Sequence, residues 1–177
     1  MKSFPELSIL SGQYKGIKLK SPGGATHPMG SREKNATFNM LAPYLEGARV
    51  IDYFAGSGAL GLEALSRGAA SVTFVENDPK AIKVIEENIA RCERGAAARC
   101  EIGAVAPCDT LPFASYDLII SDPPYDDYQV PDYASLLRPG GILALSHPSN
   151  FDPASITGLT FIKTHHYAAC HISLFTK

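Results

Sequence analysis

The stretch that most constrains the fold is residues 50–61, where a short apolar run ends in an acid and then opens into glycines. Such a run predicts a buried strand that leads into a helix. Gly56, Gly58 and Gly61 have the G-x-G-x-x-G spacing, which lets the backbone turn tightly, admits a ligand close to the main chain and packs the next helix on the sheet. The spacing alone is weak evidence for any one ligand.

Acidic residues beside the glycines narrow the choice of ligand. Asp52 precedes the glycines, where a carboxylate can reach a cationic amino group or a hydroxyl, and where a pyrophosphate site would not favour a negative charge. Residues 71–78 predict a second strand that ends in acids, and Glu76 lies about 20 residues beyond the first glycine, as expected for a ribose-binding acid. One carboxylate for a ribose and one for an amino acid moiety predict S-adenosylmethionine as the cofactor. An ordinary βα turn with solvated acids is the alternative.

Length and composition fit one globular domain with an arm. The chain has 177 residues, of which 45% are hydrophobic and 19% are charged, as in an ordinary folded domain. No apolar run is long enough to span a membrane, and the first residues lack the apolar core of a secretory signal, so we expect a cytoplasmic protein without membrane contact. The four cysteines form no C-x-x-C pair, which predicts reduced thiols and no metal site. They are Cys92, Cys100, Cys108 and Cys170.

Charge is distributed unevenly along the chain. Residues 1–49 contain seven Lys or Arg against three Glu, although the whole chain has a net charge of −2. A basic arm on an acidic core fits an arm that meets phosphates and a core that holds a cationic cofactor. A lysine-bearing hairpin that only aids solubility accounts for the same charges. We therefore predict an N-terminal basic arm over residues 1–45 and a larger domain over residues 46–177.

Local patterns predict the elements of both parts. The arm is expected to hold a small β-hairpin over residues 7–20 and a helix over residues 32–41 that Ser31 caps. Beyond it, strands alternate with helices, which predicts a doubly wound, mostly parallel α/β sheet of seven strands with ligands at the strand carboxyl ends. The predicted helices cover residues 60–67, a segment beginning at 78–79, and 133–137. The predicted strands cover residues 50–52, 71–78, 99–105, 116–121, 142–145, 159–166 and 168–175.

A second motif, Asp122-Pro123-Pro124-Tyr125, follows an apolar strand. An exocyclic amine on a nucleobase is a poor nucleophile because its lone pair is delocalised into the ring, and hydrogen-bond acceptors at its protons turn it toward tetrahedral geometry. The Asp122 carboxylate and the Pro123 carbonyl are suitable acceptors on a turn that the prolines stiffen. Tyr125 would stack on the base, which is first extruded from any helix. A turn that merely ends a strand is the alternative.

Together these motifs resemble the class I S-adenosylmethionine-dependent methyltransferases, and more closely the RsmD family of bacterial 16S ribosomal RNA guanine-N2 methyltransferases. The resemblance covers nearly the whole chain through residues 11–19, 37–41, 52–69 and 122–125. The block at 52–69 is specific to this group, whereas the tetrapeptide is shared with adenine methyltransferases of DNA and RNA. The resemblance implies a Rossmann-like fold. It also implies methyl transfer to the N2 amine of a guanine in 16S ribosomal RNA, on an assembling small subunit, with S-adenosylhomocysteine as product.

The site residues that the resemblance implies fall into two groups. The catalytic group is Asp122, Pro123, Pro124 and Tyr125. The cofactor-binding group is Asp52, Phe54, Ala55, Gly56, Gly58, Glu76, Asn77, Asp78 and Ala104. The chain departs from the family at residues 27–34, where an Arg-Pro-Thr segment and an Arg-rich helix start are usual. Residues 103–105 stand where an acid near the cofactor adenine is common, and Asp109 is a displaced candidate for it.

Three other functions fit parts of the same sequence pattern. The shared tetrapeptide also fits an adenine-N6 methyltransferase acting on DNA or RNA. The glycine spacing alone would fit a nicotinamide-dependent oxidoreductase, against which Asp52 argues. A noncatalytic RNA-binding protein would keep the fold, but the intact tetrapeptide at 122–125 disfavours it. We expect the protein to act as a monomer.

Overall fold

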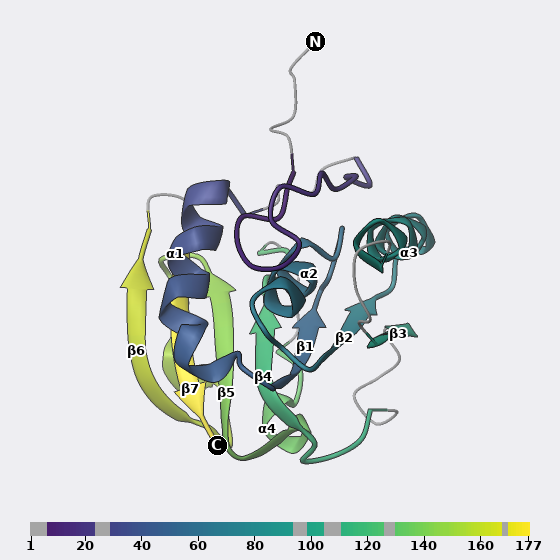
Figure 1. Cartoon of the computed structure of the whole chain (residues 1–177). Coiled ribbons are helices and arrows are strands. Elements are labelled where there is room, and N and C mark those ends of the chain that lie inside the picture. The colour runs from purple at the N-terminus through teal and green to yellow at the C-terminus, as the bar shows by residue number, and fades with distance from the viewer. Residues whose placement is uncertain (1–6, 24–28, 94–98, 105–110, 126–129, 168–169) are drawn as a thin grey trace.

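The computed structural model describes residues 7–23, 29–93, 99–104, 111–125, 130–167 and 170–177. Its centre is a seven-stranded sheet with the order β3-β2-β1-β4-β5-β7-β6 (Figure 1). The strands are β1 (Arg49–Tyr53), β2 (Ser71–Glu76), β3 (Arg99–Ala104), β4 (Tyr116–Ser121), β5 (Leu137–His147), β6 (Thr160–His166) and β7 (His171–Thr176). The first five strands in chain order pair in parallel, and β7 is antiparallel to both neighbours. The predicted mostly parallel sheet is confirmed.

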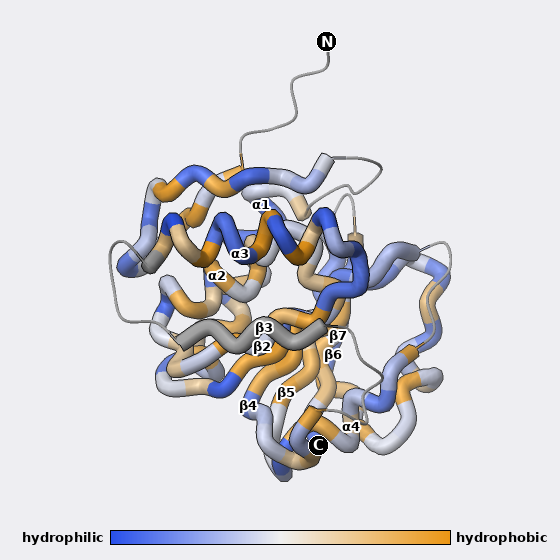
Figure 2. The backbone as a smooth tube through the Cα atoms, turned by 90° about the vertical axis from the view of Figure 1, so that its right-hand side faces the viewer, coloured by the Kyte–Doolittle hydropathy of each residue, from blue (hydrophilic) through white to orange (hydrophobic). Residues whose placement is uncertain are grey.

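Helices cover both faces of this sheet. Helices α1 (Ser31–Leu41), α2 (Ala59–Ser66) and α3 (Pro79–Glu93) lie on one face, and the short α4 (Tyr133–Leu136) lies on the other (Figures 1 and 2). Parallel strands buried on both faces require nearly continuous apolar runs, and the central strands are the most hydrophobic part of the tube in Figure 2. The doubly wound arrangement is therefore as predicted.

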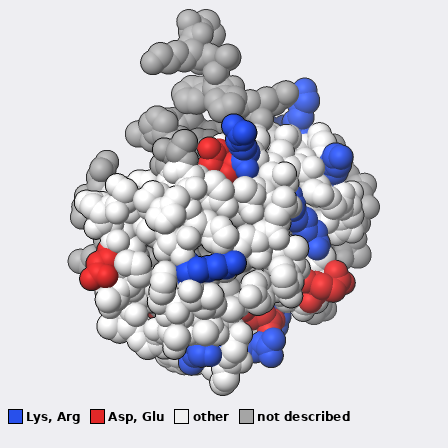
Figure 3. Space-filling view, turned by 90° about the vertical axis from the view of Figure 1, so that its left-hand side faces the viewer, with Lys and Arg blue, Asp and Glu red and all other residues white. Residues whose placement is uncertain are grey.

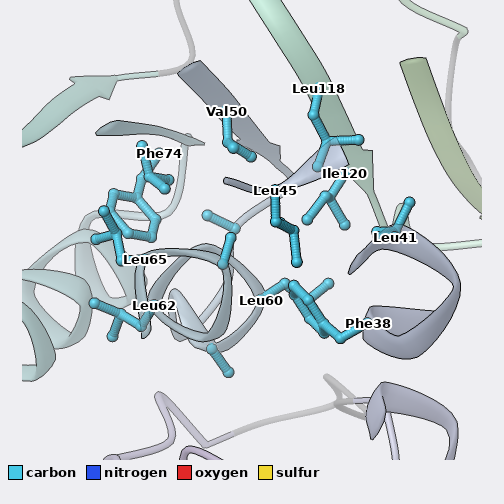
Figure 4. Close-up of a cluster of buried hydrophobic side chains, with 14 of the residues drawn as sticks. Phe38, Leu41, Leu45, Val50, Leu60, Leu62, Leu65, Phe74, Leu118 and Ile120 are labelled. Atoms are coloured by element: carbon cyan, nitrogen blue, oxygen red, sulfur yellow. The ribbon is translucent and has the colours of Figure 1, made fainter. Parts of the chain in front are cut away.

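Side chains of each strand alternate between two hydrophobic clusters. Val50 belongs to the cluster under α1, α2 and α3, whereas Ile51 and Tyr53 belong to the cluster on the α4 face. Figure 4 shows the larger cluster, in which Phe38 and Leu41 of α1 approach leucines of α2 and the side chains of β1 and β4. By the same alternation, Asp52 faces α2. The core thus fixes the side of the sheet on which this acid lies.

Several predicted boundaries shift in the structure. Helix α1 begins at Ser31, and its cap is Gly30 without a side-chain hydrogen bond, so the predicted Ser31 cap is wrong. A Cβ at Gly30 would lie 2.3 Å from Oε2 of Glu33, so the acid of the first turn already occupies this helix end. Helix α4 ends at Leu136, close to its predicted end, but strand β5 begins at Leu137 and includes Pro139, so the predicted strand start at residue 142 is wrong. Its register with β4 shifts between Tyr116 and Leu118, and such an irregularity tolerates a proline inside a strand.

The predicted N-terminal hairpin is reduced to one antiparallel bridge, between Ser8 and Lys18. The two halves of the arm still pair, since the Ile9 amide donates to the Ile17 carbonyl at 3.0 Å and the Leu19 amide donates to the Leu7 carbonyl at 2.8 Å, but the residues between them bond to α2. The amides of Leu10 and Ser11 donate to the Glu63 carboxylate at 2.8 and 3.1 Å. Gly12 has a φ of +82°, and a Cβ there would lie 1.7 Å from the Ser66 carbonyl oxygen. Helix α2 is consequently buried on every side, between the sheet and the arm.

None of the helices in the described segments is long and apolar enough to cross a membrane. In helix α3, Ile85, Ile89 and Cys92 recur at helical spacing and are buried. Cys92 and Cys170 are free thiols. The side chains of Cys100 and Cys108 lie outside the described residues.

Candidate active site

The two sequence motifs meet at the carboxyl ends of neighbouring parallel strands. In the register of β1 and β4, Tyr53 is opposite Ser121, so the glycine turn and the tetrapeptide leave the sheet side by side. Chain order reverses between these strands, because β2 lies on one side of β1 and β4 on the other. Open α/β sheets bind ligands at such a switch point. The Asp122 charge acts on Asp52, so the two acids lie within electrostatic reach.

The glycine turn has the left-handed backbone that its sequence predicts. Gly56 and Gly58 have φ values of +55° and +75°, and Phe54 shares this conformation at +65°, which is uncommon for a residue with a side chain. Gly61 has a different role, since a Cβ there would lie 2.4 Å from the Phe74 ring. The Ala55 amide donates to the Val75 carbonyl at 3.0 Å and joins the turn to β2. The turn is therefore held against the neighbouring strand.

Asp52 is the most unusual group of the site. Its side chain is 1% exposed, and Oδ2 accepts a hydrogen bond of 2.8 Å from the Gly61 amide. Oδ1 is buried and has no hydrogen-bond partner among the described residues. Burial raises the pKa of Asp52 to about 8; the Gly61 bond opposes this rise, and the charges of Asp122 and Glu76 add to it. An unpaired buried oxygen between two further acids fits a ligand with a cationic amino group.

Glu76 ends β2 and fixes the other side of the turn. Its Oε2 accepts from the Gly56 amide at 2.7 Å, and its Oε1 accepts from the amides of Asn77 and Asp78 at 2.8 and 3.0 Å. Each carboxylate oxygen has two lone pairs, so Oε2 of this half-buried group keeps one acceptor position, to which a ribose hydroxyl can donate. Asp78 accepts from the Lys80 amide at 3.0 Å and caps α3. Ala104 pairs with Glu76 in the register of β2 and β3.

The two ends of the tetrapeptide differ in their exposure to solvent. Asp122 is half-buried, Pro123 is buried, and Pro124 and Tyr125 are exposed. The Tyr125 hydroxyl lies 2.6 Å from Oγ of Ser146 on β5. Burial raises the pKa of Asp122, against the effect of a hydrogen bond from Ser146.

Sequence reasoning missed Ser146 and gave Cys170 only a structural role. Ser121 pairs with Leu145 in the register of β4 and β5, which places the following residue, Ser146, beside Asp122. Cys170 lies just before β7, and its thiol is within hydrogen-bonding reach of Ser146 and Tyr125. No local sequence signal identifies either residue, because only the order of the strands in the sheet brings them close to Asp122. Asp109 and residues 126–129 lie outside the described residues.

The basic arm has less free charge than its composition suggests. Lys34 is 2% exposed, its Nζ lies 3.3 Å from the Glu63 carboxylate, and it donates to the Ser8 carbonyl at 2.7 Å. Arg49 lies at the amino end of β1, with its guanidinium 5.6 Å from the centre of the Tyr116 ring. On the face shown in Figure 3, Lys and Arg side chains stand apart rather than in one patch. The exposed basic residues of the described arm and α1 are Lys15, Lys18, Lys20 and Arg32.

Comparison with known proteins agrees with this geometry. The family model described as Conserved hypothetical protein 95 matches residues 7–176. The chain is 31% identical over 184 residues to YlbH of Bacillus subtilis (strain 168), provisionally named as an rRNA methyltransferase, with 97% of this chain and 99% of that protein aligned. It is 34% identical over 145 residues to ribosomal RNA small subunit methyltransferase D of Escherichia coli (strain K12), covering 78% of this chain and 70% of the relative.

A solved structure has the same fold as this chain. The Escherichia coli protein yhhF, provisionally named as a methyltransferase, matches the fold with a TM-score of 0.79 and 25% identity, over 97% of this chain and 98% of that one. The match includes the sheet whose strand ends carry the site. The chain therefore belongs to the Conserved hypothetical protein 95 family and is an RsmD-type class I methyltransferase.

Proposed function

We propose that the protein transfers a methyl group from S-adenosylmethionine to the exocyclic N2 amine of a guanine in 16S ribosomal RNA. The observation that carries this proposal is the pairing of two acids at neighbouring strand ends. Asp52 keeps a buried oxygen for a cation, and Asp122 begins a rigid turn beside it. The relatives named for rRNA and small-subunit methylation support the substrate class.

The cofactor would occupy the glycine turn and the ends of β1, β2 and β3. Asp52 would pair with the ammonium of the amino acid moiety, and Glu76 would accept from a ribose hydroxyl. When bound, S-adenosylmethionine supplies an electrophilic methyl group on a sulfonium. The remaining proposed contacts are Phe54, Ala55, Gly56, Gly58, Asn77, Asp78 and Ala104.

The tetrapeptide would prepare the amine. The Asp122 carboxylate and the Pro123 carbonyl each accept an N–H bond, which turns the nitrogen lone pair out of the base plane and toward the methyl group. The Tyr125 ring, 39% exposed, offers a stacking surface for the extruded base. Asp122 orients the amine, and the proton leaves to water after transfer because methylation makes the nitrogen acidic.

The arm would contact the RNA backbone. Lys15, Lys18 and Arg32 are exposed on the arm and at the start of α1, where they can meet phosphates. We keep the division into an arm (1–45) and a methyltransferase domain (46–177) as a proposal. A ribosomal substrate would place the protein in the cytoplasm, acting as a monomer on assembling small subunits.

A methyl-transfer assay with nucleoside analysis tests the proposal. Tritiated S-adenosylmethionine is offered with undermodified small subunits, naked 16S RNA and duplex DNA in parallel. We expect label in N2-methylguanosine from the subunits. Label in N6-methyladenine instead would establish the alternative that the shared tetrapeptide suggests, an adenine-N6 methyltransferase.

A variant of Asp122 tests the assignment of roles. Asp122→Asn keeps the shape but loses the charge, so we expect transfer to fall by about 100-fold or more. Affinity for S-adenosylhomocysteine should stay near that of the parent, because Asp122 is assigned to the amine. A variant that loses cofactor affinity as well would show that this residue is wrongly assigned.

A further inference from the structure

Ser146 lies where three side chains of the site meet. It is 2% exposed on β5, and its Oγ lies 2.6 Å from the Tyr125 hydroxyl. Ser146 follows Leu145, which pairs with Ser121 in the register of β4 and β5, so it lies beside Asp122, and its hydroxyl lowers the pKa of the Asp122 carboxyl and of the Cys170 thiol by hydrogen bonding. These partners come from the turn after β4 and from the residue before β7, so one hydroxyl joins three separate parts of the chain.

The direction of these hydrogen bonds follows from their chemistry. An ionised carboxylate only accepts, and a serine has a single O–H to donate. When the Ser146 proton points at Asp122, the Ser146 oxygen must accept from the Tyr125 hydroxyl. Burial raises the pKa of Tyr125, which keeps its phenol a donor. The order is therefore Tyr125 to Ser146 to Asp122, and each bond polarises the next.

We propose that Ser146 is a positioning residue for methyl transfer, whose hydroxyl fixes both the Asp122 carboxylate and the Tyr125 ring. This inference rests on the proposed function and adds a residue to it. Ser146 occupies one acceptor position of the carboxylate and leaves the others to the target amine. Ser146 also holds the Tyr125 hydroxyl, which restrains the exposed ring, so that the stacking surface is ordered before the base binds.

Because the neighbouring groups are acidic, the hydrogen bond from Ser146 matters for the ionisation of Asp122. Burial raises the pKa of Asp122, and the bond from Ser146 is the influence that lowers it. Among the described residues, the titratable groups that act on the cluster are Asp52 from β1, Glu33 from α1, Tyr167, and Tyr125 and Cys170 themselves. All five are acids, so none of these groups supplies a positive charge that could replace the serine. Without Ser146, Asp122 would hold its proton to higher pH and accept poorly from an amine.

Two independent measurements test this role in Ser146→Ala. In methyl transfer to undermodified small subunits, we expect kcat at neutral pH to fall by about tenfold or more, with the acid limb of its pH profile moved up by about one unit. KM for the subunits and affinity for S-adenosylhomocysteine should stay close to the parent values. Carboxyl ¹³C NMR of the protein without substrate, with the Asp122 signal assigned from Asp122→Asn, should show the same upward shift of the pKa.

Two further variants separate positioning from a loss of stability. Tyr125→Phe removes the first donor on an exposed ring but keeps the bond from Ser146 to Asp122, so its shift of the acid limb should be smaller. Ser173→Ala is the matched control, because Ser173 is buried on the neighbouring β7 and bonds to His147 at 2.7 Å on the other face of the sheet. It should lower the melting temperature without moving either pH profile.

The outcomes distinguish this inference from the proposed function. Unchanged titration of Asp122 in Ser146→Ala, or equal profiles in Ser146→Ala and Ser173→Ala, would overturn the inference. Absence of methyl transfer by the parent protein on every nucleic acid would overturn the proposed function, and the NMR titration would still decide whether Ser146 controls Asp122.

Discussion

The Gly61 amide donates a 2.8 Å hydrogen bond to Oδ2 of Asp52, while Oδ1 of the same buried carboxylate has no partner within the described segments. One acid therefore anchors the first turn of α2 to the end of β1 and also keeps an oxygen for a ligand. Its charge is costly while the site holds no cation, because burial and two neighbouring acids oppose ionisation. The protonation of Asp52 should thus control both cofactor affinity and the stability of the free protein.

Cofactor affinity should rise with pH. In the free protein the pKa of Asp52 is raised to about 8, and a bound ammonium requires the ionised form. Affinity for S-adenosylhomocysteine, which has the same ammonium, should therefore fall by up to about tenfold per unit as the pH decreases from about 8 to about 6. Isothermal titration calorimetry in buffers of different ionisation enthalpy should show protons released on binding. A flat affinity across this range would contradict the assignment.

The free protein should be stabilised by Asp52→Asn at alkaline pH. The folded-state pKa lies above the usual aspartate pKa of 3.8, so the unfolded chain ionises first and folding stability falls as the pH rises from about 4 to about 8. The loss approaches about 1.4 kcal/mol per pH unit in that window. Asparagine keeps an acceptor for Gly61 and has no charge to bury. Calorimetry should give the variant a higher melting temperature at about pH 8, and a smaller advantage or none at about pH 4.

Asp52→Asn should also bind the cofactor more weakly, and its remaining cofactor affinity should no longer depend on pH. Higher stability together with lower cofactor affinity would identify Asp52 as a carboxylate that serves ligand binding and destabilises the free protein. Functional sites commonly show this trade-off between activity and stability. If Asp52→Asn lowers the melting temperature of the free protein at alkaline pH, the acid stabilises the fold and the cation site is wrongly placed.

Local sequence patterns predicted the site acids because each ends a parallel strand. Asp52, Glu76 and Asp122 follow or close apolar runs, and once the sheet is parallel their strands end at one edge. Their roles toward ligands stay predictions. Ser146 could not be found this way, since its place beside Asp122 depends on the register of β4 and β5. A pattern within one element does not report which strand lies next to it.

The arm shows a second limit of local patterns. Alternating residues predicted a hairpin, but the amides of Leu10 and Ser11 bond to Glu63, which is more than 50 positions away in the sequence. Counting charges likewise predicted a basic arm, although Lys34 is buried against the same Glu63. Both differences involve one residue, Glu63, because this single buried carboxylate on α2 accepts hydrogen bonds from the arm and pairs with Lys34 of α1.

Glu63 should therefore be critical for stability. It is fully buried and accepts from the arm amides, from Lys34 and from Arg67, whose Nε lies 2.8 Å away. Glu63→Leu leaves these donors without their acceptor, and we expect a loss of about 3–5 kcal/mol in the free energy of unfolding. Urea denaturation gives this value, and limited proteolysis should show faster cleavage within residues 7–23.

Two control variants define how specific that effect is. Lys34→Met removes one donor and leaves Glu63 with its other partners, so it should cost less than Glu63→Leu. Lys15→Met changes an exposed arm lysine and should stay within about 0.5 kcal/mol of the parent. Similar losses for Glu63→Leu and Lys15→Met would mean that the arm does not depend on this carboxylate.

A small reagent on Cys170 should block substrate without disturbing the cofactor. The Cys170 thiol is partly exposed beside Tyr125 and Ser146, and burial raises its pKa, so reaction with methyl methanethiosulfonate needs alkaline pH. An added thiomethyl group would crowd the side chains around Asp122, while Asp52 and Glu76 lie at other strand ends. We expect methyl transfer to be lost with affinity for S-adenosylhomocysteine retained. Cys170→Ser, compared with its own untreated activity, should resist the reagent; inactivation of that variant would place the sensitive thiol at another cysteine.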